Sequence, residues 1–151
     1  MANPRMVEYA DLESLVGTEV GVSDWHEIDQ ERVNLFADAT GDHQWIHVDV
    51  ERATEVMGAP IAHGYLTLSL LPMLSSEVMR VNGVTRGINY GTNKVRFTNM
   101  VPVGSKVRLR QVCKSVQEKA GGKQMVMEST VEIEGKDRPA CVAEAISILY
   151  G

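Results

Sequence analysis

The chain has 151 residues, of which 44% are hydrophobic and 23% are charged. This length and composition predict one domain over residues 1–151 with a substantial core, and no repeat or low-complexity segment interrupts it. The net charge of −5 argues against a surface that binds nucleic acid or an anionic membrane, because either needs a basic patch large enough to show in the composition. The N-terminus lacks the basic start and apolar run of a secretory signal, so we expect a cytoplasmic protein.

The first predicted elements are a short strand and a helix. Residues 18–23 alternate in the manner of a strand, and residues 29–40 have apolar side chains recurring on one helical face. Asp29 is a suitable N-cap for this helix. Gly41 is expected to end it, because glycine readily takes the left-handed conformation of a C-terminal cap.

The segment after this helix carries a carboxylate and an imidazole five residues apart. Asp42 follows Gly41, and His47 precedes a second predicted helix over residues 49–57, whose N-cap is Asp49. A carboxylate and a histidine that converge on one water molecule can orient it and exchange protons with it. The spacing therefore indicates an enzyme with an acid/base pair in a loop between two helices.

Other roles are open for these residues on spacing alone. An Asp after a helix-ending Gly is often a turn or cap residue, and a His with apolar neighbours is often structural. A metal site is a third alternative, because Asp42, His43, His47 and Asp49 are all competent ligands. Their spacing matches no closed metal motif, however, and no Cys lies nearby in the sequence.

Residues 65–78 form the most apolar segment of the chain and are apolar nearly all round, which predicts one helix buried in the core. The segment is too short, and too interrupted by Ser and Glu77, to cross a bilayer, which takes about 20 predominantly apolar residues. Pro72 is expected to remove one backbone hydrogen bond and to kink the helix. The kink is either simply tolerated or shapes a tunnel.

The C-terminal half has the patterns of an antiparallel meander. Residues 124–134 alternate between apolar side chains on one face and Glu on the other. The preceding strand, from residue 106, changes parity near Gln111, which indicates a bulge. Glycines near residues 121 and 135 supply the turns, and residues 140–150 have the composition of a covered strand.

The order of these elements predicts an α+β fold in which an antiparallel sheet wraps around a central buried helix. Two cysteines, Cys113 and Cys141, lie in predicted strands among apolar neighbours and lack CxxC spacing. Buried free thiols are therefore expected.

Three blocks of sequence carry a resemblance to a known family. They are residues 36–53, with Thr-Gly-Asp at 40–42 followed by His47; residues 59–66, with His63-Gly64; and residues 96–104, with a Phe…Pro-x-x-Gly pattern. In this order they resemble the hydratase motif, the opening of the central helix and a strand and turn of the MaoC-like family. That family contains the (R)-specific enoyl-CoA hydratases, also called 3-hydroxyacyl-thioester dehydratases. Where many members carry Asn-Pro, this chain has Gln44-Trp45, as in the branch similar to nodulation protein N.

The resemblance implies a single hot-dog fold, a homodimer, and a hydro-lyase that needs neither a metal nor a redox cofactor. The implied reaction is the reversible addition of water to a trans-2-enoyl thioester, giving a (3R)-hydroxyacyl thioester, with coenzyme A or acyl carrier protein as the carrier. Neither nucleic acid nor membrane insertion is expected. Acyl chain length and physiological direction are left open.

The same resemblance implies roles for five residues. Asp42 and His47 handle the water and the protons. Gly64 donates its N–H, unpaired at the start of a helix, to the thioester oxygen. His63 either touches substrate or bonds the backbone at the helix entry, and Trp45 adds apolar surface beside the pocket.

Two rival functions stay open. One is an acyl-CoA thioesterase on the same fold, with Asp42 as base or nucleophile, and the other is a non-catalytic acyl-binding module. The presence of Asp42, His47 and Gly64 weighs against the second. Arg86, Lys94 and Arg96 are candidates for contacts with the phosphates of the carrier, or are solvated strand charges.

Overall fold

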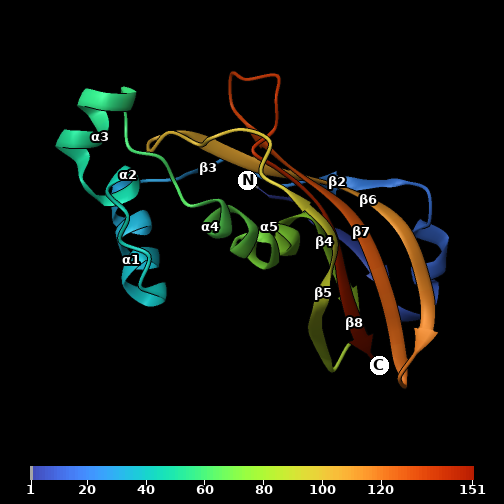
Figure 1. Ribbon diagram of the computed structural model, residues 1–151. Coiled ribbons are helices and arrows are strands. Elements are labelled where there is room, and N and C mark those ends of the chain that lie inside the picture. The colour runs from blue at the N-terminus through green and yellow to red at the C-terminus, as the bar shows by residue number, and fades with distance from the viewer. Residues whose placement is uncertain (1) are drawn as a thin grey trace.

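A computed structural model describes residues 2–151 (Figure 1). The elements follow in chain order as β1 (Arg5–Glu8), the 3-10 helix η1 (Tyr9–Leu15), β2 (Glu19–Val22), β3 (His26–Glu27), α1 (Gln30–Thr40), α2 (Trp45–Val48), α3 (Val50–Met57), α4 (Gly64–Ser69), α5 (Leu71–Val78), β4 (Met79–Asn82), β5 (Arg86–Arg96), β6 (Lys106–Lys119), β7 (Gly122–Ile133) and β8 (Cys141–Tyr150).

The main sheet has the strand order β2-β6-β7-β8-β5, and β3 also pairs with β6. All of these pairings are antiparallel, so the predicted C-terminal meander is confirmed. The hairpin between β6 and β7 turns at Ala120 and Gly121, which both have positive φ. The register of β6 against β7 shifts between Cys113 and Ser115, a little beyond the bulge expected near Gln111.

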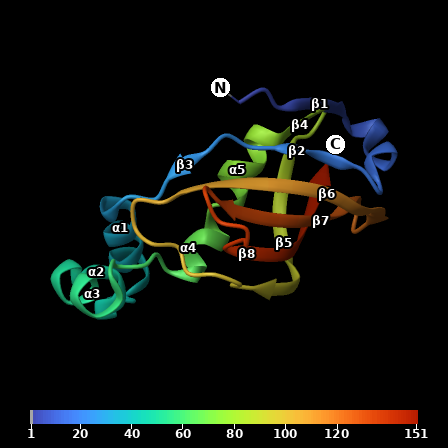
Figure 2. The same ribbon diagram turned by 90° about the horizontal axis from the view of Figure 1, so that it is seen from above.

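The sheet curves around α4 and α5, which cross its inner face (Figure 2). This is the hot-dog arrangement, and the predicted α+β fold class is confirmed. Side chains of both helices pack into the core, including Leu66, Leu71 and Leu74. A second, two-stranded sheet pairs β1 with β4 in parallel, an element that the sequence patterns did not predict.

The prediction of one helix over residues 65–78, buried all round, is wrong in two respects. The helix breaks at Leu70, and Pro72 falls in the first turn of α5 instead of kinking a continuous helix. Proline is well accommodated there, because the N–H that it lacks has no partner at a helix start. One side of the helices is also open, with Tyr65 69% and Met73 36% exposed.

Helices α1, α2 and α3 gather at one end of the sheet, beside the start of α4 (Figure 1). The predicted caps of α1 and α3 are confirmed. Asp29 accepts a hydrogen bond from the Arg32 N–H, Asp49 accepts one from the Arg52 N–H, and Gly41 is left-handed at φ 82°. Each cap fixes where its helix starts or stops, and so fixes the path of the chain between α1 and α3.

Both cysteines are buried free thiols, as expected. Burial raises the pKa of the Cys113 thiol, and it raises that of Cys141 to about 11. Across residues 2–151, no helix is both long enough and apolar enough to span a membrane.

Candidate active site

Asp42 lies immediately after the left-handed cap of α1, where the chain leaves the helix. Its side chain is 51% exposed, so solvent reaches the carboxylate. The nearest backbone donor is the Gln44 N–H, at a long 3.4 Å from Oδ1. The carboxylate therefore keeps most of its acceptor capacity for another group.

His47 lies on α2, a single helical turn between α1 and α3 that the sequence patterns did not predict. The residue is 6% exposed. Its Nδ1 lies 2.7 Å from the carbonyl oxygen of Ile61. A carbonyl oxygen can only accept, so Nδ1 carries the proton and Nε2 presents a lone pair in the neutral ring.

The chain around Ile61 is itself fixed by backbone pairing. The Ile61 N–H donates to Ile46, the Ala62 N–H donates to Val101, and the Val103 N–H donates to Pro60. The carbonyl that orients His47 is thus held by two separate segments of the chain.

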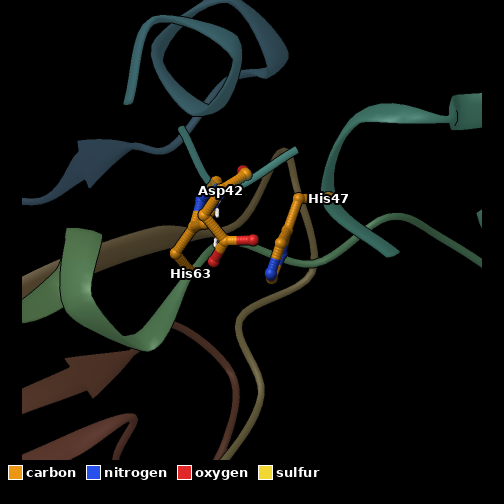
Figure 3. A group of neighbouring side chains, drawn as sticks. All are labelled: Asp42, His47 and His63. Atoms are coloured by element: carbon orange, nitrogen blue, oxygen red, sulfur yellow. Dashed lines mark hydrogen bonds and ion pairs between the residues drawn. The ribbon is translucent and has the colours of Figure 1, made fainter. Parts of the chain in front are cut away.

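His63 precedes α4 and is only 2% exposed. Its Nε2–H donates to the main-chain oxygen of Asp42 over 3.0 Å, and its ring stacks on that of His47 with centroids 3.8 Å apart and planes at 23°. Figure 3 shows the Asp42 carboxylate directed toward the two imidazoles. One side-chain oxygen of Asp42 and one ring nitrogen each of His47 and His63 lie within 4.8 Å of one another. The structure therefore brings Asp42 and His47 together, as the sequence predicted, and adds His63.

His47 and Gly64 line a cavity of about 360 Å³ at the start of α4. The other lining residues are Ile61, Ala62, Thr67, Phe97, Thr98, Asn99, Met100, Val101, Arg138 and Ala140. Within residues 2–151 the Gly64 N–H has no recorded hydrogen-bond acceptor. The Phe97 ring packs against Gly64 so closely that a Cβ built there would meet ring carbons at 2.8 Å. A glycine is thus required by this packing as well as by any approach of substrate.

The structure places the other predicted residues elsewhere. Trp45 does not line the cavity, and its ring lies under the guanidinium of Arg52 at 4.1 Å. His63 is buried behind His47 and bonds the backbone, the second of the two roles considered for it. Arg86, Lys94 and Arg96 lie along β5, outside the cavity lining.

Arg138 is a cavity residue that sequence patterns missed. It is exposed in the turn before β8, and its guanidinium has no recorded partner in the described part of the chain. The turn is fixed to the opposite wall of the cavity, because Thr98 Oγ1 donates to the Pro139 oxygen over 2.5 Å and Asn99 donates to the Arg138 oxygen over 3.4 Å. Only the tertiary fold brings this turn beside His47, so no local signal could have found it.

The metal alternative based on Asp42, His43, His47 and Asp49 is wrong as a set. His43 turns away to Asp38, at 2.9 Å, and this hydrogen bond raises its pKa. Asp49 caps α3. The cluster that does form contains His63 in place of His43 and Asp49, and the His63 ring stacks on His47 at 3.8 Å while its Nε2–H is committed to the main-chain oxygen of Asp42.

A larger groove of about 790 Å³ lies between α5 and the inner face of the sheet. Both spaces border α4, since Thr67 lines the cavity and Leu68 lines the groove, but they share no lining residue. Its lining includes Pro72, Ser75 and Met127, and contains no Asp, Glu, His, Lys or Arg. The groove can therefore hold an apolar chain but supplies no acid or base.

The chain belongs to the MaoC-like family, because the model of the MaoC-like domain matches residues 11–136. It is 55% identical over 139 residues to 3-hydroxyacyl-thioester dehydratase Z of Mycobacterium tuberculosis, covering 91% of this chain and 92% of that protein. It is 46% identical over 145 residues to nodulation protein N of Rhizobium leguminosarum, covering 93% and 89%. Among solved structures, the unliganded R-hydratase PhaJ1 of Pseudomonas aeruginosa matches with a TM-score of 0.73 and 26% identity, over 94% of this chain and 84% of that one. The predicted family and hot-dog fold are confirmed.

Proposed function

We propose that this protein is a hydro-lyase that interconverts trans-2-enoyl and (3R)-hydroxyacyl thioesters. The observation that carries the proposal is the convergence of the Asp42 carboxylate and the His47 imidazole, whose Nδ1 is held by the Ile61 carbonyl, beside a cavity lined by His47 and Gly64. The similarity to a 3-hydroxyacyl-thioester dehydratase and to an R-hydratase supports the reaction class.

The reaction needs one water molecule, a group that takes a proton from it and gives a proton to Cα, and a site for negative charge. In hydration, Asp42 and His47 remove a proton from the water, its oxygen bonds to Cβ, and the electron pair of the double bond moves onto the thioester oxygen. The dyad then returns a proton to Cα, and dehydration is the reverse. Asp42 and His47 act as one coupled pair in this scheme, without a separate proton assigned to each.

Negative charge builds up on the thioester carbonyl oxygen while Cα is without its proton, in either direction of the reaction. Hydrogen-bond donors directed at this oxygen therefore lower the barrier. The Gly64 N–H, unpaired at the start of α4, is the donor we assign to this role. We assign the acyl tail to the groove lined by Pro72, because a long apolar chain must leave a cavity of about 360 Å³ and the groove of about 790 Å³ borders the same helix, α4.

We also propose a homodimer joined along β5. This strand is the edge of the main sheet, and nearly all of its residues are exposed, including Tyr90 at 60%. An unpaired edge of this length is a template for pairing with another strand, and a second copy would cover it symmetrically. Light scattering at micromolar concentration tests this, and an active monomer would exclude it. A cytoplasmic location also stays a prediction.

Crotonyl-CoA is the simplest test of the reaction. Loss of the enoyl-thioester absorbance, with formation of (3R)-hydroxybutyryl-CoA as the product, is the expected result. Release of free thiol without hydration would support a thioesterase instead. Binding of acyl-CoA without either reaction would support the non-catalytic module.

A further inference from the structure

His63 contacts both members of the catalytic pair and is buried away from the substrate cavity. Its Nε2–H holds the main-chain oxygen of Asp42 at 3.0 Å, and its ring face lies on the ring of His47 at 3.8 Å. Phe36 of α1 packs on it from another direction, with ring centroids 4.9 Å apart. A single side chain thus joins α1, the Asp42 segment and α2 at the entry to α4.

The hydrogen bond fixes the state of the His63 ring. A carbonyl oxygen accepts only, so Nε2 carries the proton and Nδ1 is left as an acceptor in the neutral ring. Nδ1 is buried and has no partner within the described residues.

Each catalytic residue lacks one restraint that His63 supplies. Asp42 follows Gly41 in an exposed segment, and the recorded hydrogen bonds at its own N–H and carboxylate are long, at 3.5 and 3.4 Å. His47 has Nδ1 anchored on Ile61, but one hydrogen bond leaves the ring free to rock about that contact. Stacking on His63 fixes the plane of the ring, and so fixes the direction of its Nε2 lone pair.

We propose that His63 is a positioning residue, which holds the main chain of Asp42 by a hydrogen bond to its carbonyl oxygen, with the carboxylate 4.0 Å away, and holds the His47 ring by stacking, so that both side chains meet one water molecule. His63 touches neither substrate nor water in this arrangement. The inference rests on the proposed hydratase function and explains how that pair is kept in register, since a misplacement of about 1 Å can lower a rate by about 10²-fold.

Two substitutions separate the two contacts. His63→Gln keeps a side-chain N–H that can reach the Asp42 oxygen but removes the ring, whereas His63→Phe keeps a ring on His47 but removes the donor. We expect each to lower kcat for crotonyl-CoA by about 10-fold or more, with KM within about twofold. The pH profile of kcat should change in His63→Gln, where the environment of His47 is altered most. His43→Gln, one residue from Asp42 but paired with Asp38 at the surface, is the matched control and should behave as wild type.

Nitrogen-15 spectra of the histidine rings give a second measurement that needs no substitution. The wild-type protein should show His63 as the Nε2–H form and His47 as the Nδ1–H form. The His47 signals should shift in both His63 variants. His63 found as the Nδ1–H form in the wild type would overturn the proposal whether or not either variant folds.

The outcomes separate this inference from the proposed function. If wild type hydrates crotonyl-CoA and both folded variants keep full kcat with an unchanged pH profile, His63 is only structural and the proposal fails. A loss of activity fully accounted for by the unfolded fraction has the same meaning. If wild type is inactive on every enoyl thioester, the proposed function fails, while the spectra still test the alignment of the pair.

Discussion

The small cavity and the large groove flank the same helix, α4, and differ in what lines them. The cavity of about 360 Å³ contains His47, Gly64 and Arg138, whereas the groove of about 790 Å³ contains no charged side chain and no histidine. Size therefore does not locate the chemistry here. An acid/base reaction needs titratable groups held at fixed positions, and the smaller space is lined by His47, beside which Asp42 lies. The groove has room for an acyl chain. Its dimensions should therefore affect which chain lengths bind, and not the acid/base reaction.

Removing the acid/base groups at the small cavity should cause the largest loss of activity. Asp42→Asn and His47→Gln preserve approximate size but not proton exchange, so each should lower kcat for crotonyl-CoA by at least about 10²-fold, with little change in Tm. The double variant should be scarcely worse than the worse single variant, since residues that act as a unit are not additive. Steady-state kinetics and thermal melting measure both quantities. Lower Tm with full turnover in the folded fraction would make these residues structural.

Substitution of Gly64 should cause the next largest loss of activity. The role of its N–H can be separated from its packing against Phe97 in a variant that has space for a side chain at residue 64. Phe97→Ala removes the ring that a Cβ at residue 64 would meet at 2.8 Å. In that background, Gly64→Ala keeps the N–H and Gly64→Pro deletes it, and the extended His63 backbone, at ψ 137°, suits a following proline. The Pro variant should have a kcat about 10²- to 10³-fold below the Ala variant. Equal turnover of the two would move the oxyanion donor elsewhere.

Some features of these two regions could be predicted from the sequence because they depend on residues close together in the chain. Others depend on tertiary contacts and could not. The caps at Asp29, Gly41 and Asp49 act within a turn of the chain, so α1 and α3 were predictable from local spacing. The pairing of Asp42 with His47 was suggested by the same short segment. The contact of His63 with both, and the position of Arg138, depend on tertiary pairing that no local pattern encodes. The apolar composition of residues 65–78 likewise concealed the break at Leu70 and the exposed side of the helices.

A smaller effect is expected from substitution of Arg138, a charged residue that lines the cavity. Arg138 is exposed at the cavity, where we expect it to bind the phosphate of the phosphopantetheine arm shared by coenzyme A and acyl carrier protein. Arg138→Gln should raise KM for crotonyl-CoA by about three- to tenfold, in line with the loss of one partly exposed charge-assisted contact, and leave kcat unchanged. KM for crotonyl-pantetheine, which lacks the phosphate, should not change.

Lys136→Gln is the control for this prediction, because Lys136 is in the same turn but does not line the cavity. A rise in KM for crotonyl-pantetheine as well would show that Arg138→Gln disturbs the cavity wall and not phosphate binding. A crotonyl acyl-carrier-protein substrate extends the test to the other carrier.

The groove should affect chain length and leave the chemistry untouched. Ser75 is half-buried on α5 and lines the groove. Ser75→Leu fills part of that space, so kcat/KM should fall about tenfold for octenoyl-CoA or longer substrates and stay near wild type for crotonyl-CoA. Met73→Leu, on the same helix but outside the groove lining, is the control. Equal losses for short and long substrates would place the acyl tail outside the groove.

The smallest effect is expected from the two thiols, which lie in neither the cavity nor the groove. Burial disfavours their charged forms and raises both pKa values, that of Cys141 to about 11. Since the thiolate is the reactive form, iodoacetamide at pH 7.5 should leave the native protein unlabelled and fully active, and should label both residues in urea. Because burial raises the pKa of Cys141, its stabilisation of the fold is complete below the ordinary thiol pKa of 9.0 and is lost as the pH rises toward 11. Loss of activity on labelling at pH 7.5 would mean that the core opens to the reagent under native conditions.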